Sequence, residues 1–190
     1  RGSSYVVFGG AVDIMGVPVD LSALDGTNGF RLDGVAGDDY SGWSVSSAGD
    51  VNGDGYDDLI IGANGTDNYS GSSYVVFGGA ADMGASVDLS DLDGTNGFRL
   101  DGVAEGDASG QTVSSAGDVN GDGYDDLIIG AAYADINGNA SGSSYVVFGK
   151  GDGFAATVNL STLDGTNGFR LDGVAGDESG VSVSSAGDVN

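Results

Sequence analysis

Apolar residues in this chain come in short runs that are separated by Gly, Asp, Asn and Ser. Runs such as Y-V-V-F at Tyr5–Phe8 and D-L-I-I-G at Asp58–Gly62 are rich in β-branched and aromatic residues and end at glycine, which is typical of strands. Nothing in the chain shows the 3.6-residue spacing of an amphipathic helix. The pattern therefore predicts an all-β chain built from short strands.

The strand pattern repeats along the chain, together with its turns. S-S-Y-V-V-F-G starts at Ser3, Ser72 and Ser143, L-D-G-T-N-G-F-R-L-D-G-V-A starts at Leu24, Leu92 and Leu163, and V-S-S-A-G-D-V-N starts at Val45, Val113 and Val183. Subtracting these start positions gives a period of 68 to 71 residues. Each period holds four β-type segments, which indicates a blade of a β-propeller.

The repeat defines two complete units and parts of two others. The expected strands of the complete units are Trp43–Ala48, Asp58–Ile61, Ser73–Phe77 and Phe98–Asp101, then Gln111–Ala116, Asp126–Ile129, Ser144–Phe148 and Phe169–Asp172. Before them lie the last two strands of a blade, and after them its first strand: Ser4–Phe8, Phe30–Asp33 and Val181–Ala186. The expected boundaries are therefore 1–34, 35–102, 103–173 and 174–190. Because propellers close with four to eight blades, this chain predicts an incomplete ring.

The segments between the third and fourth strands vary in length and sequence among the units. They run over Gly10–Leu24, Gly79–Leu92 and Lys150–Leu163. Variable segments of this kind usually cross the surface, so we expect surface connections here.

A nine-residue loop, D-V-N-G-D-G-Y-D-D, joins the first two expected strands of each complete unit. Oxygen-bearing side chains at its first, third, fifth and ninth positions, with glycine at the sixth, suit Ca²⁺, which takes six to eight oxygen ligands. In the first loop the expected ligands are Asp50, Asn52, Asp54, the backbone carbonyl of Tyr56, and Asp58. The second loop supplies Asp118, Asn120, Asp122, Tyr124 and Asp126, and a third copy begins with Asp188 and Asn190.

Other loop types explain this sequence less well. An EF-hand needs a bidentate acidic residue at position twelve and a helix afterwards, whereas Ile61 and Ile129 occupy that position and a strand-like run follows. Thrombospondin-type repeats are usually held by disulfides, and this chain has no cysteine. The calcium nonapeptide of parallel β-helices is also absent. A turn of Asp, Asn and Gly without a metal stays open as the alternative.

Composition narrows the possible functions. The 190 residues include 5 basic and 29 acidic ones, for a formal charge of -24, which makes nucleic acid and anionic membranes poor partners. No apolar run approaches the 18 residues of a membrane span. The chain also lacks histidine, so its repeated serines have no activating base and the usual zinc and haem ligands are missing. We therefore expect no enzymatic activity.

Two further sets of residues recur. An arginine stands two residues before an aspartate in each unit, at Arg31, Arg99 and Arg170 beside Asp33, Asp101 and Asp172. This recurrence favours a structural ion pair or hydrogen bond between strands or blades over a ligand-binding arginine. Glycosylation sequons of the N-x-S/T type begin at Asn64, Asn68, Asn139 and Asn159. In a source that glycosylates its secreted proteins, exposed loops would tolerate glycans at such positions.

The sequence resembles the FG-GAP repeat of integrin α-subunit propellers and their bacterial relatives. The resemblance lies in Phe8-Gly9, Phe77-Gly78 and Phe148-Gly149, in Gly62-Ala63 and Gly130-Ala131, and in the intervening A-G-D-V-N-G-D-G-Y-D-D-L-I-I-G-A signature. It implies blades of four antiparallel strands with calcium loops on the face away from the partner-binding surface.

The resemblance also implies a role outside the cell or at its surface. The leading hypothesis is a non-enzymatic, calcium-stabilised array for adhesion or surface structure, whose partners are further repeats of the same or an identical chain and a protein or carbohydrate ligand. Assembly into a filament is one form of this hypothesis. The alternatives are a recognition module of a larger secreted enzyme and a designed or consensus protein, the latter suggested by the near-identity of the units.

Overall fold

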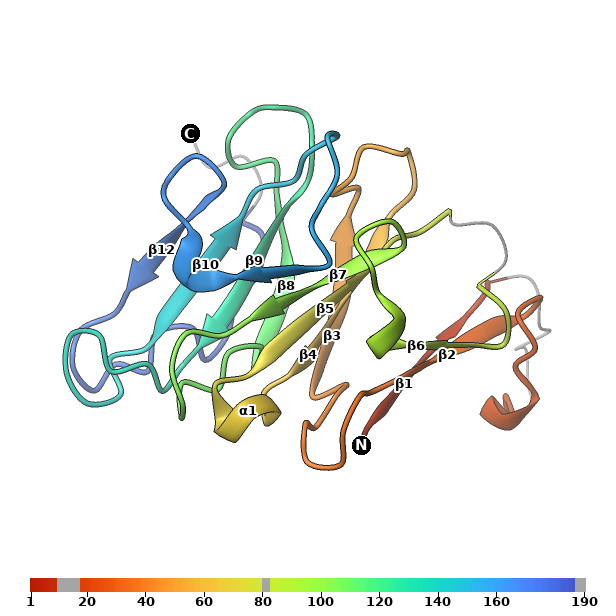
Figure 1. Cartoon of the computed structure of the whole chain (residues 1–190), viewed down its shortest axis with the longest axis horizontal. Helices are drawn as coiled ribbons and strands as arrows, with labels where there is room; N and C mark the ends of the chain where they lie inside the picture. Colours follow the sequence, from red (N-terminus) through yellow and green to blue (C-terminus); the bar gives the residue numbers. More distant parts are fainter. Residues whose placement is uncertain (10–17, 80–82, 187–190) are drawn as a thin grey trace.

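Three β-sheets form the molecule in the computed structural model, which describes residues 1–9, 18–79 and 83–186 (Figure 1). The first sheet contains β1 (Ser3–Val7), β2 (Gly29–Asp33) and β6 (Ser86–Asp88). The second contains β3 (Ser44–Gly49), β4 (Asp58–Ala63), β5 (Ser72–Val76), β7 (Gly97–Asp101) and β11 (Thr157–Asn159). The third contains β8 (Thr112–Gly117), β9 (Asp126–Ala131), β10 (Ser143–Val147) and β12 (Gly168–Asp172).

Each complete unit is a meander of four antiparallel strands. The order β3-β4-β5-β7 recurs as β8-β9-β10-β12, and the registers match, with Ile61 opposite Tyr74 in one sheet and Ile129 opposite Tyr145 in the other. This arrangement confirms the expected all-β fold of four-stranded propeller blades in an incomplete ring. The observed ends of these eight strands lie within two residues of the sequence-based ones.

The connections between third and fourth strands do more than cross the surface. The segment before β7 contains β6, which pairs in parallel with β2 of the preceding sheet, and the segment before β12 contains β11, which pairs in parallel with β7. Most described residues of these two segments are at least partly exposed, as expected of surface connections, but the sequence reasoning missed the short strand in each. Each adds a strand to the sheet of the previous unit and so ties neighbouring units together. The corresponding first connection lies partly outside the described residues.

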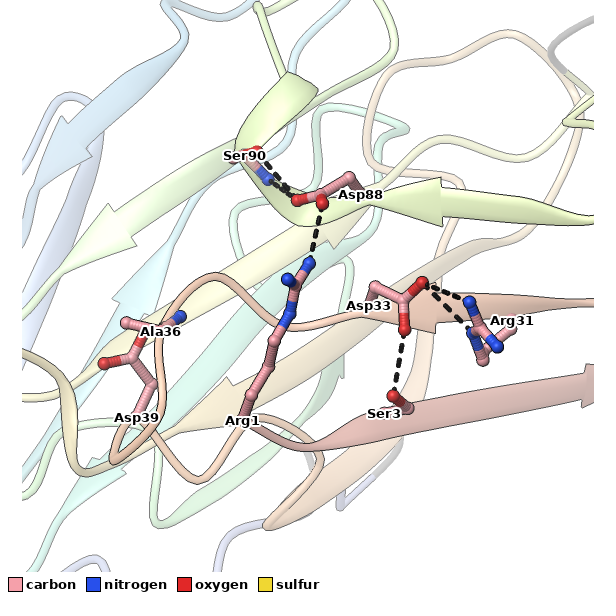
Figure 2. A network of polar contacts seen from close by, with 8 residues as sticks. All are labelled: Arg1, Ser3, Arg31, Asp33, Ala36, Asp39, Asp88 and Ser90. Atoms are coloured by element: carbon pink, nitrogen blue, oxygen red, sulfur yellow. Dashed lines mark hydrogen bonds and ion pairs between the residues drawn. The ribbon is translucent and has the colours of Figure 1, made fainter.

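A polar contact reinforces the first of these ties. The Arg1 guanidinium lies 2.7 Å from the Asp88 carboxylate at the end of β6 (Figure 2). The other oxygen of that carboxylate accepts hydrogen bonds from the Ser90 backbone and hydroxyl and so caps a 3-10 helix, η2 (Leu89–Asp91). Asp88 therefore ends the strand, starts the helical turn and holds the first unit.

Helical structure in the described part of the chain is short. It consists of η1 (Leu21–Ala23), η2, η3 (Leu160–Thr162) and a single turn, α1 (Thr66–Tyr69). None of these helices is long and apolar enough to cross a membrane.

The expected strand at Val181–Ala186 is wrong over its whole length. Ser179 forms an isolated bridge to Gly142, but residues 181–186 pair with nothing as a strand. In the other two units the first strand pairs with the D-L-I-I-G-A strand that follows the loop. The 190-residue sequence holds no third copy of that strand, so the backbone groups have no ladder to join.

The core lies between sheets, and equivalent residues are buried only where a neighbouring sheet covers them. Tyr74 and Tyr145 are 2% and 1% exposed, whereas the equivalent Tyr5, on the edge strand of the first sheet, is 44% exposed. Val113 is buried against the second sheet, whereas its equivalent Val45, on β3, is 57% exposed. Tyr5 of the first sheet, Val45 of the second and Leu171 of the third are therefore uncovered apolar residues at positions that the inner contacts bury in other units.

The recurrent arginines form ion pairs, but not between strands or blades. Arg31, Arg99 and Arg170 contact the aspartates two positions later on their own strands, at 2.8, 2.7 and 2.6 Å. Residues at i and i+2 lie on the same face of a strand, which explains this pairing. The link to the neighbouring strand comes from serines: Ser3, Ser72 and Ser143 donate hydroxyl hydrogen bonds to these aspartates.

Truncating one leucine at two repeat-equivalent positions tests this picture of the core. Leu100→Ala should lower the free energy of unfolding by about 2–5 kcal/mol, because Leu100 is fully buried among the core side chains. Leu171→Ala, at the equivalent position of the outer sheet, should cost about 1 kcal/mol or less, since Leu171 is 49% exposed. Urea denaturation measures both values, and equal costs would contradict the assigned open face.

Candidate metal centre

The two D-V-N-G-D-G-Y-D-D loops lie at the same edge of the molecule. One joins β3 to β4 and the other joins β8 to β9, and both project from the upper edge in Figure 1, opposite α1. Each loop follows a β-bulge, where the strand pairing skips Ala48 or Ala116. The hydroxyls of Ser47 and Ser115 accept the Gly49 and Gly117 amides there and so fix the entry into the loop.

The first aspartate organises each loop. Oδ1 of Asp50 accepts the Gly53 and Asp54 amides at 2.8 and 3.0 Å, and Oδ2 accepts the Gly55 amide at 2.9 Å. Asp118 makes the same three bonds at 2.7, 3.0 and 2.9 Å. Gly55 has a φ of +89°, which glycine adopts without the steric cost that a side chain brings. The loop therefore wraps around its first carboxylate.

The third and fifth positions form a pair beside it. Oδ1 of Asn52 accepts the Asp54 amide, and Nδ2 of Asn52 donates to the Asp54 carboxylate at 3.0 Å. The other oxygen of Asp54 accepts the Tyr56 amide. The second loop repeats this pair in Asn120 and Asp122. Side-chain oxygens at positions one, three and five are thus gathered on one short turn.

The ninth position differs from the others because it is buried. Asp58 and Asp126 are fully buried. The two Asp58 oxygens accept the Val51 and Gly78 amides at 3.0 and 2.9 Å. Burial raises the pKa of Asp58 to about 6, and the nearby charges of Asp54 and Asp50 add to the rise. Burial likewise raises the pKa of Asp126. Each loop therefore holds a buried carboxylate close to other carboxylates and with no basic side chain bonded to it.

These residues fit a hard cation, although the loop alone does not bring its carboxylates into a tight cluster. No three acidic side chains within the described ranges converge closely enough to form a ready-made metal cluster. Their oxygens accept loop amides instead. Oδ1 of Asp50 and of Asp118 accepts two amides, but Oδ2 of each accepts only one and keeps a further lone pair. The donors are all oxygen, as Ca²⁺ and Mg²⁺ require. Asp188 and Asn190, the start of the third loop, lie outside the described residues.

The expected glycosylation sites are placed differently from one another. Asn64 is only 8% exposed, whereas Asn68, Asn139 and Asn159 are exposed. The Asn68 amide donates to Glu105, and Asn159 caps η3 by accepting the Ser161 amide. Only the three exposed asparagines offer room for a glycan on the folded chain.

Two features of the surface were missed by the sequence reasoning. Asp125, the eighth residue of the second loop, accepts the Asp50 amide of the first loop at 2.9 Å. Its recurrence in both loops marked the residue, but nothing local showed which neighbour it contacts. Tyr40, Trp43 and Tyr69 form an exposed aromatic cluster, with ring centroids 6.2 and 6.3 Å from Tyr40. Because Trp43 does not recur in the other units, the repeat gave no signal for this cluster.

Comparison with known proteins places the chain in a class. Residues 41–76 and 109–147 match the FG-GAP repeat family. The chain is an FG-GAP repeat protein of the integrin-α-like kind. It is 34% identical to integrin alpha pat-2 of Caenorhabditis elegans over 142 residues. That alignment covers 67% of this chain and 11% of the relative. It is also 30% identical over 161 residues to integrin alpha-6 of Gallus gallus, which covers 82% of this chain and 13% of that protein. The chain thus spans roughly a tenth of the length of these curated relatives.

A glycine substitution tests the loop geometry. Gly55→Ala should lower the free energy of unfolding by about 1–2 kcal/mol, because alanine is strained at a φ of +89° even though no atom lies within 4 Å of the added methyl group. Gly37→Ala is the matched control: its methyl group also meets nothing within 4 Å, and its φ is not positive. Thermal or urea denaturation compares the two, and equal stabilities would contradict the left-handed conformation at position six.

Proposed function

We propose that this chain is part of a calcium-binding FG-GAP array with a structural or adhesive role outside the cell. The observation that carries the proposal is the pair of loops in which a fully buried carboxylate, Asp58 or Asp126, lies beside further acidic ligand candidates. A buried charge without a partner is costly, and a divalent cation would offset that cost. Asp50, Asn52, Asp54, Asp58 and the Tyr56 carbonyl would hold one ion, and Asp118, Asn120, Asp122, Asp126 and the Tyr124 carbonyl a second.

Calcium is the cation that best suits this role and place. Each loop offers five oxygen-bearing groups, and a carboxylate that binds through both oxygens, or a water, would complete the six to eight oxygens that Ca²⁺ takes, whereas Mg²⁺ keeps several waters and a strict octahedron. Extracellular calcium modules bind with dissociation constants of about 0.1–1 mM, so such sites fill outside the cell and stay largely empty in the cytosol. The similarity to integrin α subunits supports the same location.

The partners that we propose first are further repeats of this chain or of an identical one. Each unit buries its apolar faces only against the units next to it, so it needs a neighbour on each face. The exposed Tyr5 and Val45 on one side, and Leu171 on the other, are repeat-equivalents of buried core residues. We propose unit boundaries at 1–34, 35–102, 103–173 and 174–190. A longer chain of repeats would cover these faces, and so would a filament of identical chains joined face to face.

A second candidate function is recognition of a carbohydrate or protein ligand as a module of a larger secreted protein. The exposed cluster of Tyr40, Trp43 and Tyr69 favours it, because aromatic side chains with a polar end are enriched at binding surfaces. The cluster includes a residue of α1, at the edge opposite the calcium loops. Sequence beyond either end discriminates the two candidates: more identical repeats favour the array, and a hydrolase domain favours the recognition module.

Removing calcium tests the metal assignment. Each site adds about 1.4 kcal/mol of stability for every tenfold excess of calcium over its dissociation constant. We therefore expect excess chelator to lower the melting temperature, and Asp54→Ala combined with Asp122→Ala to do the same and to abolish any further effect of chelator. Circular dichroism or differential scanning calorimetry measures the transition.

The control for this test removes two charges elsewhere. Asp38→Ala combined with Asp91→Ala takes away the same charge at exposed positions outside both loops, and this variant should keep its response to chelator. An unchanged melting curve of the wild-type chain in excess chelator would overturn the calcium proposal.

The open faces lead to a separate expectation about assembly. The native material should be either a longer polypeptide than the 18.6 kDa chain or an assembly of several copies of it. For the assembly, Val45→Lys and Leu171→Lys should reduce association, because each places a charge in an apolar contact. Tyr133→Lys, at a similarly exposed aromatic residue in the loop between β9 and β10, should not. Intact mass and light scattering decide, and a folded, dispersed 18.6 kDa monomer would contradict both forms.

A further inference from the structure

The two metal loops touch each other directly. The Asp50 amide donates to Oδ2 of Asp125 at 2.9 Å, and the Asp125 amide donates back to the Asp50 carbonyl at 3.2 Å. The Lys150 amide donates to the Val51 carbonyl at 2.9 Å, one residue further along. The start of the first loop is therefore hydrogen-bonded to the end of the second loop and to the segment after β10.

Close packing accompanies these hydrogen bonds. A methyl group added at Gly53 would overlap the Tyr124 ring, and one added at Gly49 would overlap the Asp125 carboxylate. Tyr124 also lies against Gly149 and Gly151 of its own unit. Tyr124 and Asp125 of the second loop thus fill the space beside Asp50, the first ligand candidate of the first loop.

The contact runs in one direction along the chain. Val51, which follows Asp50, is fully buried beneath it, whereas the equivalent Val119 of the second loop is 51% exposed. Asp125 is half-buried, whereas the equivalent Asp57 of the first loop is exposed. The two loops have the same sequence, but only the first has its entry held by a neighbour within the described residues.

We propose that the two sites are energetically coupled and that Asp125 is the positioning residue that couples them. This inference rests on the proposed calcium binding. An ion in the second loop would hold the Tyr124 carbonyl and the Asp126 carboxylate, and so would fix Asp125 between them in the position that orients Asp50. The first loop would then bind its ion more tightly, and by linkage the first ion would strengthen the second to the same extent.

Single-site variants measure this coupling in the 190-residue chain. Asp122→Ala removes a ligand candidate of the second loop and leaves the first loop intact, and Asp54→Ala does the reverse. By calorimetric titration with Ca²⁺, disabling the second loop should weaken binding at the first loop by about 5-fold or more, the lower end of typical coupling between sites. The wild-type chain should bind two ions more tightly than the two single-site variants together predict.

Asp125 and Asp57 provide a matched pair for the mechanism. Asp125→Ala should weaken binding at the first loop to nearly the extent that Asp122→Ala does, because it removes the acceptor for the Asp50 amide. Asp57→Ala takes the same charge from the same loop position but removes no such contact, and should change neither site. Asp125→Asn keeps an acceptor oxygen and should restore most of the coupling, which loss of charge alone would not explain.

The outcomes separate this inference from the calcium proposal. If no variant and no wild-type chain takes up Ca²⁺, the proposed function itself fails. If both sites bind but Asp122→Ala leaves the first loop at its wild-type affinity, or if Asp125→Ala behaves like Asp57→Ala, the coupling is overturned. If Asp125→Ala does not fold by circular dichroism, the single-site titrations and Asp125→Asn decide. In the wild-type chain, the Asp50 amide resonance should also shift when the second loop fills.

Discussion

Burial between neighbouring sheets is the interaction on which the rest of this structure depends. A four-stranded meander with apolar side chains on both faces cannot cover itself, so Tyr74, Leu100 and Val113 become core only because another sheet lies against them. The parallel strands β6 and β11 follow the same logic, since each leaves its own unit to extend the sheet before it. The unit of stability in this protein is therefore the pair of adjacent blades, and a blade at either end keeps part of its apolar surface in water.

The second constraint is the large excess of acidic residues, and the structure places them in distinct settings. Asp25, Asp93 and Asp164 accept side-chain and backbone hydrogen bonds from a threonine two residues later, which lower the pKa of each carboxyl. Asp33, Asp101 and Asp172 are paired with arginines and cross-strand serines. These charges are held by the protein itself. Asp58 and Asp126 instead lie at the buried end of a loop, where burial raises the pKa of each carboxyl. A bound cation would therefore stabilise the charged form of these two aspartates most.

The sequence could predict what depends on local pattern and could not predict what depends on distant partners. The strands that end at Asp101 and Asp172 were correct because β-branched and aromatic runs bounded by glycine specify a strand locally. The three residues of β6 carry no such pattern, and they are a strand only because β2 lies beside them. The reverse holds for Val181–Ala186, where a strand-like sequence has no partner and stays irregular. The spacing of candidate ligands could likewise be read from the loop, but the contact between Asp125 and Asp50 joins residues 75 positions apart.

The position of the loops connects these two constraints. The stability of a repeat array is approximately the sum of what each unit contributes and what each interface contributes. An ion that only closed its own loop would add to the stability of its own unit. Asp125 of the second loop accepts the amide of Asp50 in the first, and Val51, next to Asp50, belongs to the core between the two sheets. Ordering of a loop therefore also affects the stability of the interface between units. On the proposed calcium binding, the metal would then stabilise the contact between blades as well as the hairpin that holds it, and the same short loop would serve both the electrostatic and the packing requirement of the fold.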